Sequence, residues 1–424
     1  MTAPTQARCP FGPGAAVDGE ERVSLYSEEF AADPLAAYRE MRAQYGSLVP
    51  VWLAPGVAAT LVVGYRTALR VMHDEEHFPA APSRWEETAD PSSSVFEVLR
   101  GRRNGLRTAG PDHKRYRGAI NDALTGIDRF RVERIIDDHA QLLINTFCEV
   151  GRADLRGQYA YPLTFWVMCG LLGLAPEDAH SAWAQMAAML DGDAEAGPRF
   201  GEALYKAVQA KRAAPGDDVI SRLIEHPAGL DDVEVVEQTA LLLGPGTEPT
   251  CNLITNAVLL TLRDERFGGD VHGGSLSVRD AIAEVLFTDT PLPNFGATYP
   301  PQPLLIEDVW LPAHQPVLIS YAACNTDPAV DQQGIDRDGN HSHLSWGAGA
   351  HACPTRARDI AGIIVARAVE LLIDAIPDLT FAAEAPTWRP GPFHRALAAL
   401  PVTFQPCPPM NLAMPPMHPK ENSR

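Results

Sequence analysis

The sequence predicts a mainly helical fold with small β-sheets, of the α+β class. Apolar residues recur at helical spacing almost without interruption through residues 130–240. A further helical pattern, the longest apolar one in the chain, runs from Val235 to Leu262. Runs rich in β-branched residues are short by comparison. Together these three observations favour a helical body that carries a few short strands.

Length and composition are those of a globular protein with a sizeable core. The chain has 424 residues, of which 46% are hydrophobic and 21% are charged. Residues 1–22 are rich in Pro, Gly and charge and predict a flexible N-terminal arm. Residues 406–424, with many Pro and Met, predict a disordered tail. Large single domains of this size exist, and we expect residues 23–405 to form one domain.

Charge and cysteine content bear on partners and location. The formal net charge is −19, and such a field repels nucleic acid and anionic membranes. The seven cysteines include no CxxC pair, which argues against a disulfide framework and for a reducing compartment. The N-terminus lacks an apolar signal core, and no run of about eighteen apolar residues occurs. We therefore expect a soluble, cytoplasmic protein that binds neither nucleic acid nor membrane.

The N-terminal part predicts a helix, a hairpin and a second helix. Asp33 is an N-cap and the following Pro34 suits a first helical position, so a helix begins there and continues through Tyr45. Val49–Leu53 and Ala59–Val63 predict paired strands around a Pro-Gly turn. A short helix, Arg66–His73, follows.

The rest of the chain predicts a loop and then a series of helices. Residues 78–110 are rich in Pro, Ser and Arg, and their lack of periodicity predicts a loop. The expected helices beyond it are Val132–Cys148, Leu163–Leu174, a stretch near Trp183, Asp217–Ile224, Val235–Leu262, Arg279–Phe287 and Ala357–Ile376.

One stretch carries the chemistry, the loop from His343 to Cys353 that precedes the last of these helices. It holds two histidines, one cysteine, and the glycines Gly347 and Gly349, which let the backbone bend tightly and pass close to something flat. The start of a helix after Cys353, together with nearby Arg356 and Arg358, favours the thiolate, which is the metal-binding form of cysteine. The residues therefore predict a thiolate presented from a Gly-rich loop.

The segment from Trp346 through Cys353 to Thr355 resembles the haem-binding loop of the cytochrome P450 superfamily, with Trp346 in place of the usual Phe and Thr355 in place of the last Gly. The resemblance implies the cytochrome P450 fold and a haem b cofactor. It makes Cys353 the iron ligand, the only metal ligand from the protein, and His351 a partner of a haem propionate. Thiolate ligation raises the electron density on iron and favours O–O cleavage.

Two other interpretations of this loop stay open. A buried free cysteine is commonly no more than a small hydrophobic residue. A zinc site is also possible by sequence distance, from His341, His343, His351 and Cys353, although the one-residue gaps fit the usual ligand spacing poorly.

His113 and Arg117 lie four residues apart at the start of a helix and therefore share one face. The planar guanidinium group of Arg can donate two hydrogen bonds to a carboxylate. The His113–Arg117 pair resembles the superfamily motif that binds the haem propionates. The usual propionate-binding Arg is absent from residues 295–303. By this resemblance the haem-binding residues are His113, Arg117, His343, Gly347, Gly349, His351 and Cys353. With fewer cationic contacts, we expect weaker haem retention than is usual.

The segment Gly244–Thr250 resembles the superfamily segment that crosses the open face of the haem. This similarity makes Gly246, Glu248 and Thr250 the candidate catalytic residues: Gly246 for close access, and Glu248 for proton relay. Pro249 stands where the oxygen-activating Thr is expected, and a proline inside a helix removes an amide donor and kinks the helix. Thr250 points about 100° further round the helix, so we expect impaired proton delivery.

A second departure lies in the helix that carries Glu284. Phe287 stands where the superfamily has a nearly universal Arg, so the resemblance leaves Arg337 to pair with Glu284. The resemblance also places Trp85, Val95, Phe96 and Leu99 in a loop that faces substrate; a solvated loop is the alternative.

The function implied by the resemblance is the oxidation of a small organic molecule, such as a secondary metabolite. Electrons would come from NAD(P)H through ferredoxin reductase and ferredoxin, for which Arg356 and Arg358 form a candidate docking patch; ordinary solvated arginines are the alternative. Three hypotheses remain: an oxygen-dependent monooxygenase or an enzyme that couples aryl groups, a peroxide-using haem enzyme, and a catalytically weak haem protein that binds ligand or a partner protein. Pro249 and Phe287 keep the third open.

Overall fold

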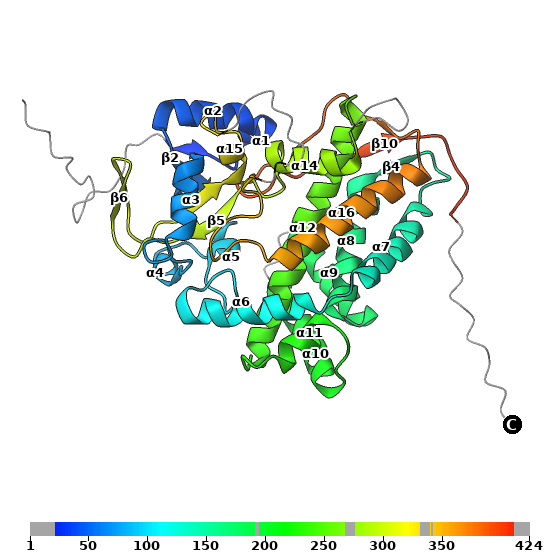
Figure 1. Ribbon diagram of the computed structural model, residues 1–424, viewed down its shortest axis with the longest axis horizontal. Helices are drawn as coiled ribbons and strands as arrows, with labels where there is room; N and C mark the ends of the chain where they lie inside the picture. The colour runs from blue at the N-terminus through cyan, green and yellow to red at the C-terminus, as the bar shows by residue number, and fades with distance from the viewer. Residues whose placement is uncertain (1–21, 191–194, 268–275, 331–339, 341, 411–424) are drawn as a thin grey trace, which may run out of the picture.

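The computed structural model describes residues 22–190, 195–267, 276–330, 340 and 342–410. Helices dominate it, as predicted, and α12 runs through the body beside α8 and α16 (Figure 1). The helices are α1 (Glu28–Ala32), α2 (Pro34–Tyr45), α3 (Tyr65–His73), α4 (Ser83–Glu86), α5 (Phe96–Leu99), α6 (Gly110–Thr125), α7 (Arg129–Ile144), the π-helix η1 (Arg156–Ala160), α8 (Tyr161–Leu172), α9 (Pro176–Leu190), α10 (Ala196–Ala213), α11 (Val219–Glu225), α12 (Asp232–Arg263), α14 (Val278–Thr288), α15 (Tyr321–Asn325) and α16 (Thr355–Ala375).

The strands form three small sheets. They are β1 (Val23–Ser24), β2 (Leu48–Ala54), β3 (Val57–Val62), β4 (Arg152–Asp154), β5 (Asn294–Thr298), β6 (Leu304–Ile306), β7 (Val309–Leu311), β8 (Val317–Ser320), β9 (Thr380–Phe381) and β10 (Pro401–Thr403). The largest sheet has the order β1-β2-β3-β8-β5, and the others are β4-β10-β9 and β6-β7. The mainly α fold with small sheets is thus confirmed.

The predicted N-terminal helix and hairpin are present, with the expected helix cap and turn. The Asp33 side chain accepts a hydrogen bond from the Ala36 amide and so caps α2. The β2–β3 hairpin pairs Val51 with Ala59, and both side chains are fully buried. Gly56 takes a positive φ of 77° in the turn between the two strands.

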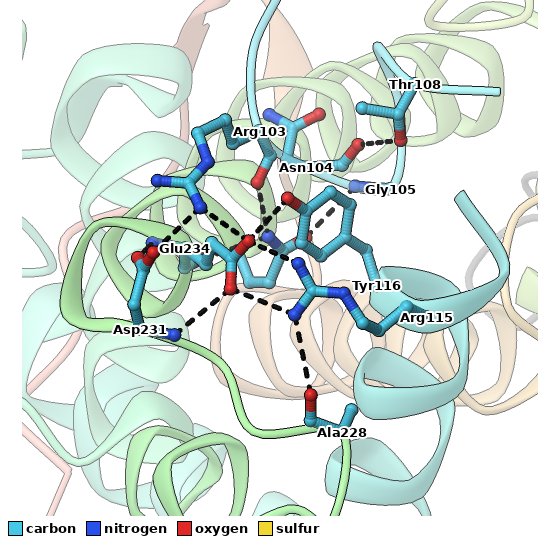
Figure 2. A network of polar contacts seen from close by, with 10 residues as sticks. Arg103, Asn104, Gly105, Thr108, Arg115, Tyr116, Ala228, Asp231 and Glu234 are labelled. Carbon is cyan, nitrogen blue, oxygen red and sulfur yellow. Dashed lines mark hydrogen bonds and ion pairs between the residues drawn. The ribbon is translucent and has the colours of Figure 1, made fainter. Parts of the chain in front are cut away.

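The buried apolar side chains of the described residues form three clusters, of which the two larger ones matter most for the site. The larger core joins the long helices, with Leu163, Ile254 and Val365 fully or nearly fully buried. The second core covers one face of the largest sheet. Helix α12 begins with a capping box formed by Asp231 and Glu234, and Glu234 also joins it to α6 (Figure 2).

The segment between α3 and α6 is more ordered than its sequence predicts. Trp85, Val95 and Leu99 are buried in the core of the sheet, and the ring of Trp85 stacks on Phe96 with centroids 5.8 Å apart. None of the four lines the main cavity. The expectation that these side chains face substrate is therefore wrong, because they supply the apolar cover that the sheet needs.

At the C-terminal end, residues 406–410 are attached to the helical body. The Cys407 amide donates to the Cys148 carbonyl, and Asn145 and Met410 exchange two hydrogen bonds. The remainder of the expected tail, like the arm over residues 1–21, lies outside the described residues. Across the described part of the chain, no helix is both long enough and apolar enough to cross a membrane.

Candidate active site

The loop before α16 has the tight geometry that its two glycines predict. Gly347 and Gly349 have positive φ values of 67° and 68°. A Cβ on Gly349 would lie 1.9 Å from the carbonyl oxygen of Met72, so this backbone packs directly on α3. The Cys353 amide donates to the Trp346 carbonyl at 2.8 Å. The loop is closed on itself and holds the Cys353 side chain at the wall of a cavity.

The electrostatics at Cys353 differ from the expectation. Burial raises the pKa of the Cys353 thiol, and the opposing effects of Arg358 and Arg117 do not outweigh it. The arginines predicted to form an exposed patch are half-buried: Arg358 donates to the Cys353 carbonyl at 2.9 Å, and Arg356 donates to the Ile127 carbonyl. Arg358 favours the thiolate, as the sequence predicts, but the effect of burial on the pKa is larger. A bound metal cation deprotonates a ligating thiol directly.

His113 and His351, from α6 and the Cys353 loop, meet at one end of the cavity. Their ring centroids are 4.0 Å apart. Both ring nitrogens of His113 and Nδ1 of His351 are buried without a hydrogen-bond partner. Arg117, one turn along α6 from His113, lines the cavity and donates to the Ala352 carbonyl. The structure therefore brings together three of the predicted haem-binding residues, His113, Arg117 and His351, beside Cys353.

Burial and three basic neighbours keep the His351 ring neutral. Burial lowers the pKa of His351 to about 4, with further lowering from His113, Arg117 and Arg107. Burial also lowers the pKa of His113, and Arg117 adds to the effect. Orphaned polar atoms of this kind are rare in buried positions and indicate a missing partner.

The cavity has a volume of about 240 Å³ and lies between the Cys353 loop and α12. Its walls are largely apolar and come from α6, α8, α12, α16 and the segment from α14 to β5, with Ile120, Leu171, Leu253, Phe295 and Ile364 among the side chains. Such a concave, apolar site with a few convergent polar groups is typical of a cofactor or small-molecule site.

Helix α12 presents to this cavity the residues that the sequence singles out. Gly246, Pro249 and Thr250 all line it. A Cβ on Gly246 would lie 2.6 Å from Cε of Met168, so the absence of a side chain there leaves room for Met168. Both Pro249 and Thr250 reach the cavity, although they are adjacent in the helix. The catalytic roles of Gly246 and Thr250 stay predictions.

Glu248 lies on the same turn but does not line the cavity. Its carboxylate pairs with Arg389 at 2.7 Å and with Arg156 at 3.3 Å. These contacts join α12 to η1 and to the segment before β10. The proton-relay role of Glu248 stays a prediction, and the structure places the group among cations outside the cavity lining.

The remaining predicted site residue, His343, packs edge-on against Phe287, with ring centroids 5.1 Å apart. It does not line the cavity, so the structure does not bring it to the Cys353 side chain. Phe287 is itself buried in α14. Arg337, expected to pair with Glu284, lies outside the described residues.

Asn325 and Ser345 join α14 to the Cys353 loop. Asn325 Nδ2 donates to the Leu286 carbonyl and to Ser345 Oγ, each at 3.0 Å. Its Oδ1 accepts from the Leu344 amide at 2.6 Å. Ser345 Oγ donates to the same Leu286 carbonyl. These bonds hold the loop against α14 next to Phe287, the position at which the superfamily Arg is absent.

The zinc hypothesis finds no support within the described residues, where no group of three or more His, Cys, Asp and Glu side chains is arranged to hold a metal ion. His341 lies outside them. The hypothesis that Cys353 only fills space also fits poorly, because Cys353 lines a cavity rather than a packed core.

Sequence reasoning missed Arg107. Its side chain is only 4% exposed, and its guanidinium lies over the cavity-lining ring of Phe295, with Cζ 5.4 Å from the centroid. Four other arginines occur in residues 78–110, and no periodicity separates Arg107 from them. Only the fold shows that this one is buried.

A haem fits these residues. Cys353 offers one sulfur to a metal, the apolar walls suit a porphyrin, and the two glycines let the backbone approach its face. The orphaned nitrogens of His113 and His351, with Arg117, suit the two carboxylates of the porphyrin edge. The fold and this site define a haem-thiolate protein.

Comparisons with known proteins agree. No family model matches the chain. The cytochrome P450 monooxygenase PikC of Streptomyces venezuelae is 28% identical over 396 residues, covering 89% of this chain and 92% of PikC. Cytochrome P450 107B1 of Saccharopolyspora erythraea is 30% identical over 318 residues, covering 70% and 76%. The structure of CYP154C4 from Streptomyces sp. ATCC 11861 superposes with a TM-score of 0.78 at 24% identity, covering 91% of this chain and 98% of that one.

The chain belongs to the cytochrome P450 superfamily. It is therefore a haem-binding enzyme of the monooxygenase type. The predicted fold and the predicted superfamily are both confirmed.

Proposed function

We propose that this protein is an oxygen-dependent haem-thiolate monooxygenase, with haem b as cofactor, that oxidises a small and largely apolar organic molecule such as a secondary metabolite. The observation that carries the proposal is the largely apolar cavity that both Cys353 and α12 line. Haem held by a thiolate supplies oxygen activation when electrons are delivered from outside. A ferredoxin, its reductase and NAD(P)H are the electron source that we propose.

The chain's own residues supply binding and positioning. Cys353 donates the sulfur ligand, Arg117 provides a positive charge for the carboxylates at the porphyrin edge, and the orphaned ring nitrogens of His113 and His351 provide hydrogen bonds to them. The apolar side chains of the cavity exclude water and bind the substrate by burial of its apolar surface. We retain His343 as a candidate cofactor contact and Glu248 as a candidate proton source.

Pro249 supports two alternatives to an oxygen-dependent monooxygenase. It lines the cavity where a hydroxyl group is expected, and it carries neither a hydroxyl nor an amide hydrogen. A reaction that needs little proton delivery from the protein, such as coupling of aryl groups, or one driven by peroxide, depends less on that hydroxyl. These are the alternatives that the same observation supports.

The test is the absorption spectrum of the reduced protein with carbon monoxide. We expect the red-shifted band of a thiolate-bound haem in the wild-type protein and in Cys407→Ala, a control at a half-buried cysteine that does not line the cavity. Cys353→Ala should lose the band. A band that survives Cys353→Ala would overturn the assignment.

Turnover then separates the functions. We expect oxidation of an apolar test substrate with ferredoxin, reductase and NADPH under air. Turnover with hydrogen peroxide alone would favour the peroxide-using enzyme. A thiolate spectrum without turnover under either condition, across steroid, fatty-acid and aryl substrates, would favour a haem protein that only binds a ligand or a partner.

A further inference from the structure

Arg107 is a buried cation without a buried anion. It makes no ion pair with any carboxylate of the described residues, although its side chain is 4% exposed. Nε and Nη2 both donate to the Val98 carbonyl, at 3.0 and 2.6 Å. Nη1 makes no hydrogen bond within the described part of the chain. Burial lowers the pKa of Arg107, which reflects the cost of an unpaired charge away from water.

The position of Arg107 is fixed by contacts with α12. The Arg107 amide donates to Asn104 Oδ1 at 3.1 Å, and the neighbouring Gly105 amide donates to Gln238 Oε1 at 3.0 Å. Gln238 Nε2 returns a hydrogen bond to the Arg103 carbonyl at 2.8 Å. Figure 2 shows Arg103, Asn104 and Gly105 lying against the start of α12. These contacts fix the main chain at Arg107, and the two hydrogen bonds to the Val98 carbonyl hold the guanidinium itself.

The guanidinium lies behind the cavity wall at the end where the basic residues gather. It covers the ring of Phe295 and is close enough to His351 and Tyr321 to affect their pKa values. Phe295, His351 and Tyr321 all line the cavity. His351 in turn contacts His113. Arg117 and His351 thus line the cavity, and behind that lining His113 lies against His351 and Arg107 against Phe295.

Desolvation makes this arrangement unfavourable unless an anion joins it. Moving an ion out of water costs several kcal/mol even after the protein relaxes, and buried charges in proteins are normally paired. A carboxylate at this end of the cavity would compensate the cost. Haem carries two such groups, and Cys353 lines the same cavity.

We propose that Arg107 binds a haem propionate and takes the place of the arginine that residues 295–303 lack. The guanidinium reaches the site from the segment before α6 instead of from β5, and the ring of Phe295 supports its face. The proposal rests on haem binding through Cys353. It adds a cation to the propionate contacts that the sequence predicts.

The experiment measures haem transfer from the holoprotein to an excess of apomyoglobin. Arg107→Met removes the charge and keeps much of the side-chain volume. Arg84→Met is the matched control, because Arg84 belongs to the same segment and is an exposed partner of Glu87. Each protein is loaded with haem or with haem dimethyl ester, in which both carboxylates are masked.

With haem, we expect Arg107→Met to release the cofactor about tenfold or more faster than wild type, as loss of a charged hydrogen bond implies, and Arg84→Met to match wild type. With the dimethyl ester, Arg107→Met and wild type should release at the same rate. Arg107→Lys keeps the charge and should be intermediate with haem; it provides the comparison if Arg107→Met does not fold.

Equal release of haem from Arg107→Met and wild type would overturn the proposal. If Arg107→Met released the dimethyl ester faster than wild type by the same factor as haem, the proposal would also be overturned. An arginine with a purely structural role would affect the release of both cofactors equally. The carbon monoxide spectrum of each variant separates the two proposals. A wild-type protein that binds no haem overturns the proposed function and this inference together, whereas a thiolate spectrum with unchanged haem release overturns this inference alone.

Discussion

At the residue scale, Gly349 is the glycine of the described residues whose added Cβ would lie closest to another atom. It combines a positive φ with a backbone neighbour, the carbonyl of Met72, that cannot move aside as a side chain could. The neighbouring Gly347 also has positive φ, but its Cβ would meet nothing closer than 3.5 Å. The approach of the Cys353 loop to α3 therefore depends on one missing methyl group.

We expect Gly349→Ala to lower the free energy of unfolding by about 3 kcal/mol or more and to reduce the haem content of the purified protein, since strain and overlap act together. Gly229→Ala is the matched control. Gly229 has a φ of 61° with no atom near the added methyl, so its cost should be only about 1 kcal/mol. Urea unfolding measures the free energy of unfolding of each variant, and haem absorbance measures its haem content. Equal costs would show that the contact with Met72 is unimportant.

At the element scale, α12 carries the main departure from the superfamily pattern. The helix continues through Pro245 and Pro249, although Pro249 removes the hydrogen bond that the Pro245 carbonyl would otherwise accept. The two prolines thus leave α12 a single helix from Asp232 to Arg263.

We expect Pro249→Thr to raise the amount of product formed per NADPH, because it restores a hydroxyl at the cavity wall. It should also raise the free energy of unfolding by about 1–3 kcal/mol, because proline in a helix interior is costly. Pro301→Thr, at an exposed position outside the helices, controls for the loss of a proline. Product and NADPH are measured together in the same reaction. Unchanged coupling in Pro249→Thr would contradict the idea that the missing hydroxyl limits proton delivery.

Glu234 joins α12 to α6, the helix that carries His113 and Arg117. Its carboxylate accepts hydrogen bonds from Arg103, Arg115, Tyr116 and the Asp231 amide (Figure 2). Burial raises the pKa of Glu234, but the hydrogen bonds from Arg115, Tyr116 and Asp231 outweigh it and lower the pKa to about 2. A carboxyl group with a lowered pKa stabilises the fold above its ordinary pKa and loses that effect as the pH falls.

Glu234→Gln should therefore lower the free energy of unfolding at pH 7 by about 2 kcal/mol or more. The gap between variant and wild type should narrow as the pH falls from about 5 toward 2. Glu87→Gln, at an exposed pair with Arg84, should change little at any pH. Denaturant unfolding at several pH values provides the measurement, and a gap independent of pH would contradict the assigned pKa.

At the scale of the whole molecule, the cavity lies where the helical core meets the sheet. Its walls include Leu171 and Leu253 from the helices and Phe295 from β5. Arg107 and Arg117 bond only to backbone carbonyls and make no ion pair within the described residues, so a bound anion would supply their counter-charge. We infer that the cofactor contributes to the fold as well as to the chemistry.

Haem removal should therefore lower the melting temperature, by an amount that grows with haem affinity, because a ligand that binds only the folded state stabilises it. The decrease in melting temperature on haem removal should be larger in wild type than in Arg107→Met, because the variant has one unpaired cation fewer. Thermal unfolding of the holoproteins and haem-free proteins, followed by circular dichroism, measures both. Equal melting temperatures with and without haem would contradict this view of the molecule.

The sequence by itself determined the fold class and the superfamily, and it predicts the cysteine ligand, because these depend on local signals. Helical periodicity, the N-cap at Asp33 and the spacing of Gly347, Gly349 and Cys353 are all readable within a few residues. The shared helix face of His113 and Arg117 is likewise readable from their spacing of four residues.

Only the tertiary structure decided which charged groups are buried and what they face. It placed Arg107 behind Phe295, turned Glu248 toward Arg156 and Arg389, and packed His343 on Phe287. The physical reason is that burial and pairing are set by contacts between segments far apart in the chain, which leave no periodic trace in the sequence. The charge environment of the cavity is therefore a property of the assembled fold.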